Sequence, residues 1–175
     1  MDAQGNVEYL AKIRDRIQRD GPPRVAYAMA REFHEEVVDV TLTRFSHRRG
    51  TQTPSPPGQP PAVVGGHLRR AIRLYAASRT GAYTAESRVR PLIVYARIQE
   101  TGGTIHAHGK ALRWTSDAAF GPLAKGQKRK GNVHFAQSVT LPKRPYMKPT
   151  HEAVISNGRM RRAAVAEMRD LVTRG

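Results

Sequence analysis

The residues best placed for chemistry are three histidines in the second half of the chain. His106 and His108 alternate along a stretch expected to be extended, so both imidazoles should lie on one face. His134 is the nearest third candidate ligand by strand pairing. A zinc site normally needs three or four ligands with hydrogen-bonded support, and no acidic residue lies near the pair in sequence. We therefore predict no metal and no cofactor, with a zinc hydrolase at these histidines as a minor alternative.

Acid/base and nucleophilic catalysis find little support in the residue pattern. Glu32, Glu35 and Glu36 are neighbours on an expected amphipathic helix, where such carboxylates usually form a solvated face. The chain has no cysteine and no Gly-x-Ser-x-Gly sequence, which excludes disulfides, thiolate catalysis and cysteine zinc sites. We predict that the protein is not an enzyme and has no catalytic residues.

Positive charge dominates the composition. The 175 residues include 30 Lys and Arg against 14 Asp and Glu, a net charge of +16. Residues 1–50 hold nine basic against eight acidic residues, whereas residues 101–175 hold fourteen against four. This basic half favours an anionic partner, either nucleic acid or an acidic protein surface, although a solvated face that maintains solubility explains charge alone equally well.

A basic segment without apolar periodicity lies between two expected strands. Residues 116–132 contain three glycines and little that would anchor them to a core. We expect a mobile basic loop here that contacts a partner. Its candidate interface residues are Lys125, Lys128, Arg129 and Lys130.

Two N-terminal helices and an extended arm are expected before the strands. Apolar spacing from Asn6 predicts a first helix that ends at Gly21-Pro22-Pro23, and a second helix should run from about Pro23 to Phe45. Residues 46–61 then include five prolines and have no apolar periodicity. They predict an extended proline-rich arm suited to lie along a neighbouring subunit.

The remainder of the chain predicts short strands and a C-terminal helix. Pro91 should mark a strand edge or the end of pairing, because it has no N–H to donate. The final helix should follow Pro149, with an interruption at Asn157-Gly158. The strands are expected near residues 72–77, 82–94, 104–107, 111–115 and 133–140. The predicted fold is α+β, in one domain of residues 1–175, with N-terminal helices, a small mainly antiparallel sheet of about four to five strands, a C-terminal helix and the proline-rich arm.

No apolar run approaches the length of about 20 residues that crosses a bilayer. The start of the chain also lacks a basic region followed by an apolar one. We therefore expect no contact with a membrane and folding in a cytoplasm.

Three stretches carry a more specific pattern. They are Pro60–Ile72 (PPAVVGGHLRRAI), Tyr95–Ile105 (YARIQETGGTI) and Leu141–Pro149 (LPKRPYMKP). The second joins a one-turn helical pattern to a glycine pair and a β-branched step, and the three prolines of the third leave its backbone few conformations. In this order the stretches resemble the neck and tail-completion proteins of long-tailed bacteriophages, a family similar to the minor tail protein Z group.

The resemblance implies an α+β subunit that assembles with its own copies into a hexameric ring at the head-proximal end of the tail. Such a ring is a structural virion component that joins tail to head and lets DNA pass through its lumen. The implied partners are the tail terminator, the tail tube and the head-completion proteins, and assembly takes place in the host cytoplasm. Within the stretches, the expected junction or interface residues are Tyr95, Arg97, Glu100, Gly102, Gly103, Arg144, Pro145 and Tyr146.

The alternative function is a stand-alone nucleic-acid-binding protein. The basic loop and the arginines of the last helix are suited to contact phosphates. The chain lacks the paired aromatic residues of a base-stacking surface, so such binding would be independent of sequence and strongly dependent on salt.

Overall fold

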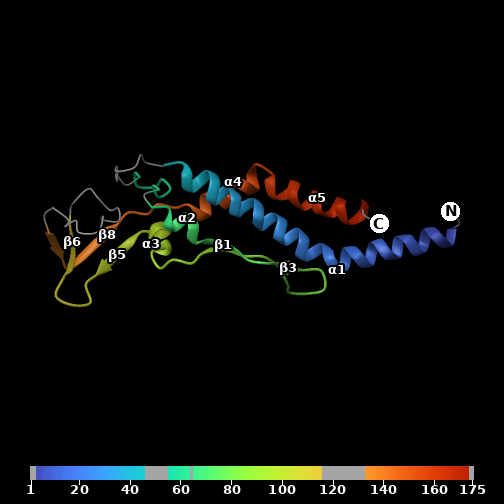
Figure 1. The fold of residues 1–175 in the computed structure, drawn as a ribbon, viewed down its shortest axis with the longest axis horizontal. Helices are drawn as coiled ribbons and strands as arrows, with labels where there is room; N and C mark the ends of the chain where they lie inside the picture. Colours follow the sequence, from blue (N-terminus) through green and yellow to red (C-terminus); the bar gives the residue numbers. More distant parts are fainter. Residues whose placement is uncertain (1–2, 46–54, 64, 116–132, 174–175) are drawn as a thin grey trace, which may run out of the picture. The chain divides into compact units, whose positions relative to one another are not determined.

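The computed structural model describes residues 3–45, 55–63, 65–115 and 133–173. It confirms the α+β class: a long N-terminal helix, several small two-stranded sheets, and C-terminal helices that pack on the N-terminal helix (Figure 1). The chain divides into two compact units. Unit 1 comprises Met1–Glu36, Ile72–Arg90 and Thr150–Gly175, and unit 2 comprises Val37–Ala71 and Pro91–Pro149.

Among the described residues, the longer helices lie toward the two ends of the chain, with short strands and two short α-helices between them. The α-helices are α1 (Ala3–Glu35), α2 (His67–Ala71), α3 (Ala96–Thr101), α4 (Met147–Ser156) and α5 (Arg159–Thr173). A π-helical turn η1 (Glu36–Val40) and a 3-10 turn η2 (Thr41–Thr43) follow α1. The strands are β1 (Ile72–Leu74), β2 (Ser78–Arg79), β3 (Ala85–Glu86), β4 (Val89–Pro91), β5 (Gly103–His106), β6 (Leu112–Thr115), β7 (Val133–Ala136) and β8 (Ser138–Leu141).

The prediction of two helices separated at Gly21-Pro22-Pro23 is wrong, because α1 continues through all three residues. Gly21 is buried rather than part of an exposed stop. A Cβ atom at this position would lie 3.6 Å from the Met168 sulfur and 3.7 Å from a methyl group of Leu171. The glycine therefore lies where α5 packs on α1, and it is not the end of a helix.

Arg79 explains how a helix can accommodate two consecutive prolines. Pro22 and Pro23 lack the N–H groups that would bond the carbonyls of Gln18 and Arg19, four residues earlier. The Arg79 guanidinium, from β2, donates to both of these carbonyls, at 2.7 Å for Arg19. A side chain from another element thus supplies the donors that the proline pair removes.

Replacing this donor should weaken α1 at its centre. We expect Arg79→Ala to lower the free energy of unfolding by about 1–2 kcal/mol, because two carbonyls lose a charged donor at an exposed site. Chemical denaturation followed by circular dichroism measures the change. Arg73→Ala is the matched control, since Arg73 is an exposed arginine on β1 with no side-chain hydrogen bond among the described residues. Equal stabilities for the two variants would contradict this role of Arg79.

Ion pairs and a backbone contact attach the C-terminal part of α5 to α1. Arg24 donates to Glu167 at 2.9 Å and to Asp170 at 2.6 Å. Nη1 of Arg16 donates to the carbonyl oxygen of Leu171 at 3.1 Å, and the Leu171 side chain is buried. These contacts place α5 antiparallel to α1 within unit 1.

At the other end of α5, Arg159 bonds two carboxylates of the N-terminal helical region that were predicted to form a solvated face. Arg159 donates to Glu32 at 2.9 Å and also bonds Glu36. The two carboxylate side chains are only 20% and 17% exposed, so they are not part of a solvated face. Asn157 and Gly158 separate α4 from α5, and Gly158 has φ of 74°, as the predicted interruption requires.

The predicted single sheet of four to five strands is also wrong. The described strands form four two-stranded sheets, β1–β4, β2–β3, β5–β8 and β6–β7, and the last three pairs are antiparallel. Gln137 divides the strand expected at residues 133–140, so β7 pairs with β6 while β8 pairs with β5. The expected role of Pro91 is confirmed, because β4 ends at this residue.

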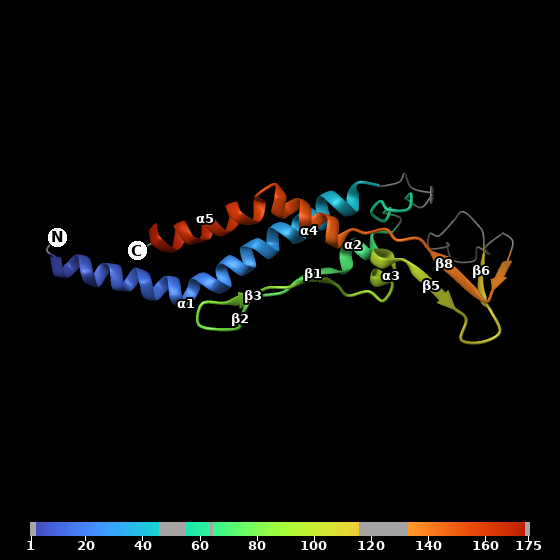
Figure 2. The same cartoon turned by 180° about the vertical axis from the view of Figure 1, so that it is seen from behind.

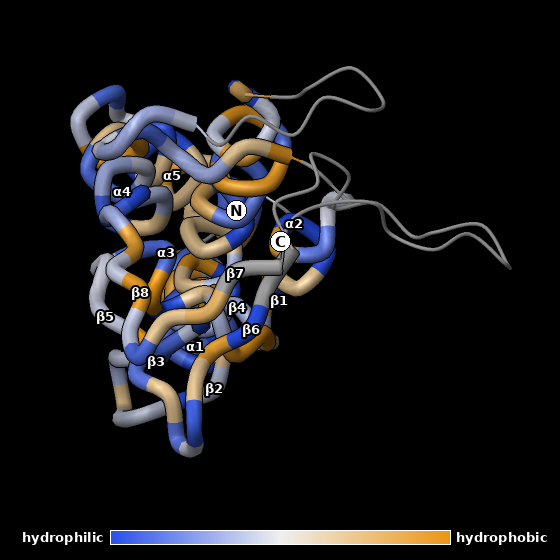
Figure 3. Tube along the Cα trace, turned by 90° about the vertical axis from the view of Figure 1, so that its left-hand side faces the viewer, coloured by the Kyte–Doolittle hydropathy of each residue, from blue (hydrophilic) through white to orange (hydrophobic). Residues whose placement is uncertain are grey.

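Among the described residues, no helix combines the length and the apolar character needed to cross a lipid bilayer. The tube coloured by hydropathy shows hydrophilic and hydrophobic residues alternating along the helices (Figure 3). Residues 46–54 of the predicted arm and the predicted basic loop of residues 116–132 lie outside the described residues. The single-domain organisation stays a prediction.

Candidate functional site

Three segments of unit 2 meet around the end of α3. They are α3 itself, the glycine pair that leads into β5, and the residues that join β8 to α4. The expected junction residues that the structure brings together here are Tyr95, Glu100, Gly102, Gly103, Arg144 and Tyr146.

The Glu100 side chain caps the N-terminus of α4. One carboxylate oxygen accepts the N–H groups of Tyr146 at 2.8 Å and Met147 at 3.0 Å, and the other accepts that of Lys148 at 3.0 Å. The first N–H groups of a helix have no acceptor within the helix, and they lie at the positive end of its dipole. A carboxylate satisfies both conditions, so Glu100 holds residues 146–148, where α4 begins, against the end of α3.

Tyr146 is the most enclosed aromatic residue of this junction, with 1% of its surface exposed. Burial raises the pKa of its phenol, with smaller contributions from the Glu100 carboxylate and Tyr95. The neutral phenol is therefore strongly favoured in the folded chain. The half-buried Pro145 precedes it and limits the approach of the chain to α4.

Gly102 occupies a position where no other residue fits without strain. Its φ is +67°, and a Cβ atom would lie 2.7 Å from the Lys143 nitrogen and 3.0 Å from the Leu141 oxygen. Both neighbours are backbone atoms, so neither can rotate away. Gly103, at φ of +150°, then begins β5 opposite Leu141. The glycine pair thus lets α3 reverse directly into a paired strand.

Arg144 connects this junction to the end of the proline-rich segment. Its N–H donates to the Gln99 carbonyl at 2.6 Å, and its guanidinium donates to the Ser55 carbonyl at 2.9 Å. The Gly58 N–H donates to the Lys143 carbonyl at 2.9 Å. The described part of the predicted arm, residues 55–61, is therefore held within unit 2 instead of extending away from it.

One expected junction residue makes no side-chain hydrogen bond within the described structure, and two residues that do bond the junction were not predicted. Arg97 is exposed, and its side chain has no hydrogen bond among the described residues. Gln99 and Ser55 were missed because each contributes a backbone carbonyl, which residue type does not reveal. Four predicted interface cations lie outside the described residues: Lys125, Lys128, Arg129 and Lys130.

The strand pairing places His106 and His134 in different two-stranded sheets. His106 lies opposite Ser138 in the β5–β8 pair, whereas His134 lies opposite Trp114 in the β6–β7 pair. His108 follows the end of β5. In the described part of the chain, no group of three or more His, Cys, Asp or Glu side chains is arranged to hold a metal ion.

The arrangement is suited to a mechanical role. The Glu100 carboxylate accepts three N–H groups of one helix start, so its contacts hold one segment of backbone in place. Gly102 lies against the backbone of residues 141 and 143, and Arg144 bonds the carbonyls of Gln99 and Ser55. These contacts likewise hold segments of backbone together. The junction therefore sets the path of the chain between α3, β8 and α4.

Comparison with protein-family models, with curated proteins and with solved structures gives no match.

Proposed function

We propose that this chain is a structural subunit of the phage neck, a tail-completion protein that forms a hexameric ring at the head-proximal end of the tail. The ring joins the tail to the head and leaves a channel for DNA. The tail tube, the tail terminator and the head-completion proteins are the proposed partners, and the proposed location is the virion. The subunit has no enzymatic role in this proposal.

One observation carries the proposal. Two of the three stretches that resemble tail-completion proteins, residues 95–105 and 141–149, form one structural junction through Glu100 and Gly102. The residues of these two stretches therefore depend on each other physically, as parts of one junction. This supports the resemblance more strongly than three separate short matches would.

The surface of unit 2 is also suited to assembly. Every residue of β5 is exposed, and β5 and β8 form a sheet of only two strands, so each strand has an edge without a strand partner in the described structure. Leu92 and Val94 are large apolar residues with 54% and 99% of their surface exposed. Open edges and exposed apolar side chains promote association, and a neighbouring subunit would cover them.

Positive charge has a use in such a ring. A net charge of +16 favours a lumen or a rim that contacts DNA or acidic neighbouring rings. The same charge supports the alternative of a stand-alone nucleic-acid-binding protein. Arg161, Arg162 and Arg169 are exposed on α5 in unit 1 and give this alternative a described surface.

Binding to tails and to DNA separates the two functions. The full chain is sedimented with purified tail tubes, and in parallel it is titrated with random-sequence duplex DNA over a range of salt concentrations. We expect saturable binding at the tube end at physiological salt, and only weak DNA binding by the free subunit. Tight DNA binding with a steep salt dependence, and no binding to tubes, would overturn the connector in favour of the alternative.

A further inference from the structure

The first turns of α1 extend beyond the helix on which the rest of α1 packs. Leu171 contacts Arg16, and α5 ends at Thr173. Residues 4–10 of α1 are all exposed, and Figures 1 and 2 show this end of α1 continuing past the end of α5. We call residues 4–10 the overhang. Such a short piece of helix is marginally stable in water without a packing partner.

The overhang has an apolar face without a partner in the described structure. Val7 and Leu10, three residues apart, expose 66% and 63% of their surface. The overhang also differs in charge from the rest of this basic chain. Residues 1–10 contain two acidic residues and no Lys or Arg, and the acidic residue inside the overhang is Glu8.

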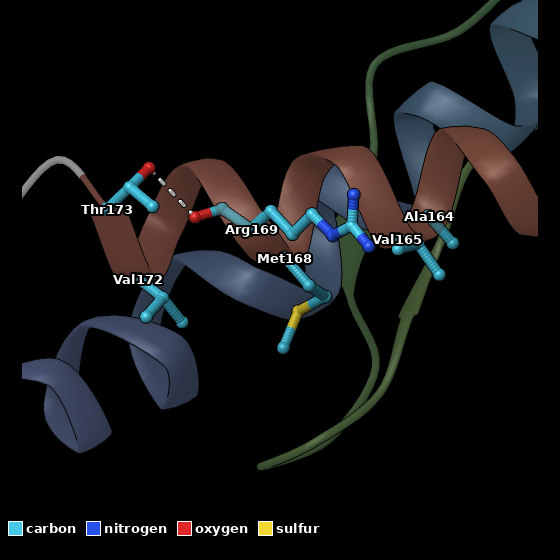
Figure 4. A pocket seen from close by; sticks show the side chains of 6 residues that line it. All are labelled: Ala164, Val165, Met168, Arg169, Val172 and Thr173. Carbon is cyan, nitrogen blue, oxygen red and sulfur yellow. Dashed lines mark hydrogen bonds between the residues drawn. The ribbon is translucent and has the colours of Figure 1, made fainter.

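The outer face of α5 has the complementary properties. A shallow groove along this helix is lined by Ala164, Val165, Met168, Arg169, Val172 and Thr173 (Figure 4). It begins beside the contact with α1, where Met168 packs at Gly21, and extends outward to Val165 and Arg169. Val165 and Val172 are 42% and 41% exposed, and the Arg169 side chain extends along the helix toward Val165 (Figure 4).

The charge of this outer face is entirely positive. Arg161, Arg162 and Arg169 are exposed there, whereas the carboxylates of Glu167 and Asp170 bond Arg24 of α1. Neither the Arg161 nor the Arg169 side chain has a hydrogen bond or ion pair among the described residues. The outer face of α5 is thus an apolar strip with unpaired cations, and the overhang is an apolar strip with a carboxylate.

We infer that the overhang of one subunit docks on the outer face of α5 of the next subunit in the ring. This inference rests on the proposed function, because it names the contact by which the ring forms. Val7 and Leu10 cover Val165 and Val172, and Glu8 lies among the arginines. An α5-to-α5 contact is disfavoured, because it would bring the arginines of two copies together.

The same chain cannot make this contact with itself. Residues 16–32 of α1 occupy the inner face of α5, and the overhang continues the same helix beyond the end of α5. It therefore cannot return to the outer face of its own α5. Each subunit offers two different surfaces, so the contact is head-to-tail, and such contacts generate closed rings when the rotation between subunits closes.

The test disables each half of the contact in a separate full-length variant. Leu10→Asp places a carboxylate in the apolar face of the overhang, and Val165→Asp does the same in the groove. Both side chains are exposed in the subunit, so we expect unchanged thermal unfolding of both variants. Sedimentation velocity should show that each variant has lost the ring, with at least tenfold weaker association.

Mixing the two variants gives the decisive result. A pair with one subunit of each variant retains one intact contact. In this contact the overhang of the Val165→Asp subunit docks on α5 of the Leu10→Asp subunit. An equimolar mixture should therefore form dimers that cannot extend into a ring. Rings formed by either variant alone, or a mixture that stays monomeric, would overturn the inference.

A control variant and a cross-linking experiment test whether the overhang and the outer face of α5 are the two contacting surfaces. Ile155→Asp changes an apolar residue on α4 whose exposure, 55%, lies between those of Leu10 and Val165, outside both surfaces, and should leave the ring intact. Because the chain has no cysteine, Leu10→Cys and Val165→Cys can be mixed with a short bis-maleimide, and we expect a covalent dimer. Loss of the ring in Ile155→Asp, or cross-linking of Leu10→Cys to Ile155→Cys instead, would contradict the proposed pair of faces.

Failure of this contact and failure of the connector give different results. If the wild-type chain forms rings and binds tail tubes while both aspartate variants do the same, the ring forms through another surface and only the inference fails. If the wild-type chain neither forms rings nor binds tubes, both proposals fail. Intact rings together with lost DNA binding in Val165→Asp and Arg169→Ala would make α5 a DNA surface and overturn the inference.

Discussion

Gly102→Ala should lower the free energy of unfolding by about 3–5 kcal/mol, a large share of the roughly 5–15 kcal/mol that stabilises an ordinary domain. The added methyl group would lie 2.7 Å from the Lys143 nitrogen and 3.0 Å from the Leu141 oxygen, both in the backbone. Positive φ adds strain of its own for any residue with a Cβ atom. Relief would require β8 to move away from β5, which would break their pairing.

Urea denaturation of the full-length variant measures this loss. Gly109→Ala is the matched control, because a Cβ atom at Gly109 meets no atom within 4 Å. We expect the control to change the unfolding free energy by less than about 0.5 kcal/mol. If Gly102→Ala unfolds at the same urea concentration as the control, the junction does not have the close backbone approach described above.

Glu100→Ala should be the second most damaging substitution, with a loss of about 2–4 kcal/mol. Three N–H groups at the start of α4 would lose their acceptor together, and two of them belong to the buried Tyr146 and the half-buried Met147. Water can reach such groups only by opening the junction. Glu100→Gln should lose less, because the amide oxygen still accepts hydrogen bonds although the favourable charge is gone.

The same denaturation experiment tests this ranking. Glu86→Ala is the control, since Glu86 makes an exposed ion pair with Arg88 that contributes little to stability. The order of loss should be Glu100→Ala, then Glu100→Gln, then Glu86→Ala. Equal losses for the alanine variants of Glu100 and Glu86 would show that capping of α4 does not hold the junction together.

Local sequence patterns predicted the elements whose causes are local. The helical turn near residues 95–100, the reversal at Gly102-Gly103, the end of pairing at Pro91 and the division between α4 and α5 all follow from the residues at those positions. Glycine conformations and missing proline donors depend little on the rest of the fold, which is why these predictions are confirmed.

Predictions that depended on distant residues were wrong. Pro22 and Pro23 should end a helix by their own chemistry, but Arg79 supplies donors to the two carbonyls that they leave free. The carboxylates Glu32 and Glu36 form an ordinary helix face in sequence, and only the fold places Arg159 beside them. No local pattern contains these partners.

The strands illustrate the same limit. Residues 133–140 contain no glycine or proline and are rich in valine, phenylalanine and threonine, so sequence alone predicts one strand. The fold divides the run at Gln137 because its two halves pair with different partners, β6 and β5. Pairing partners are a tertiary property and override the local preference.

At the candidate site, the sequence predicted the residues but not their connections. Glu100, Gly102 and Tyr146 were expected to shape a junction, and the structure brings them together. That Glu100 caps α4 could not be predicted, because the acceptor and the helix start are separated by 46 residues. Backbone carbonyls such as those of Gln99 and Ser55 leave no pattern in residue type.

The central claim is that copies of this chain close into a ring that joins the tail to the head. The mass of the native assembly tests it most directly, measured at low and high salt, alone and with purified tail tubes, and followed by electron microscopy of the particles. We predict one discrete hexameric mass and a ring with an open centre, either free or at the tube end. A monomer at every salt concentration that does not bind tubes would contradict the claim.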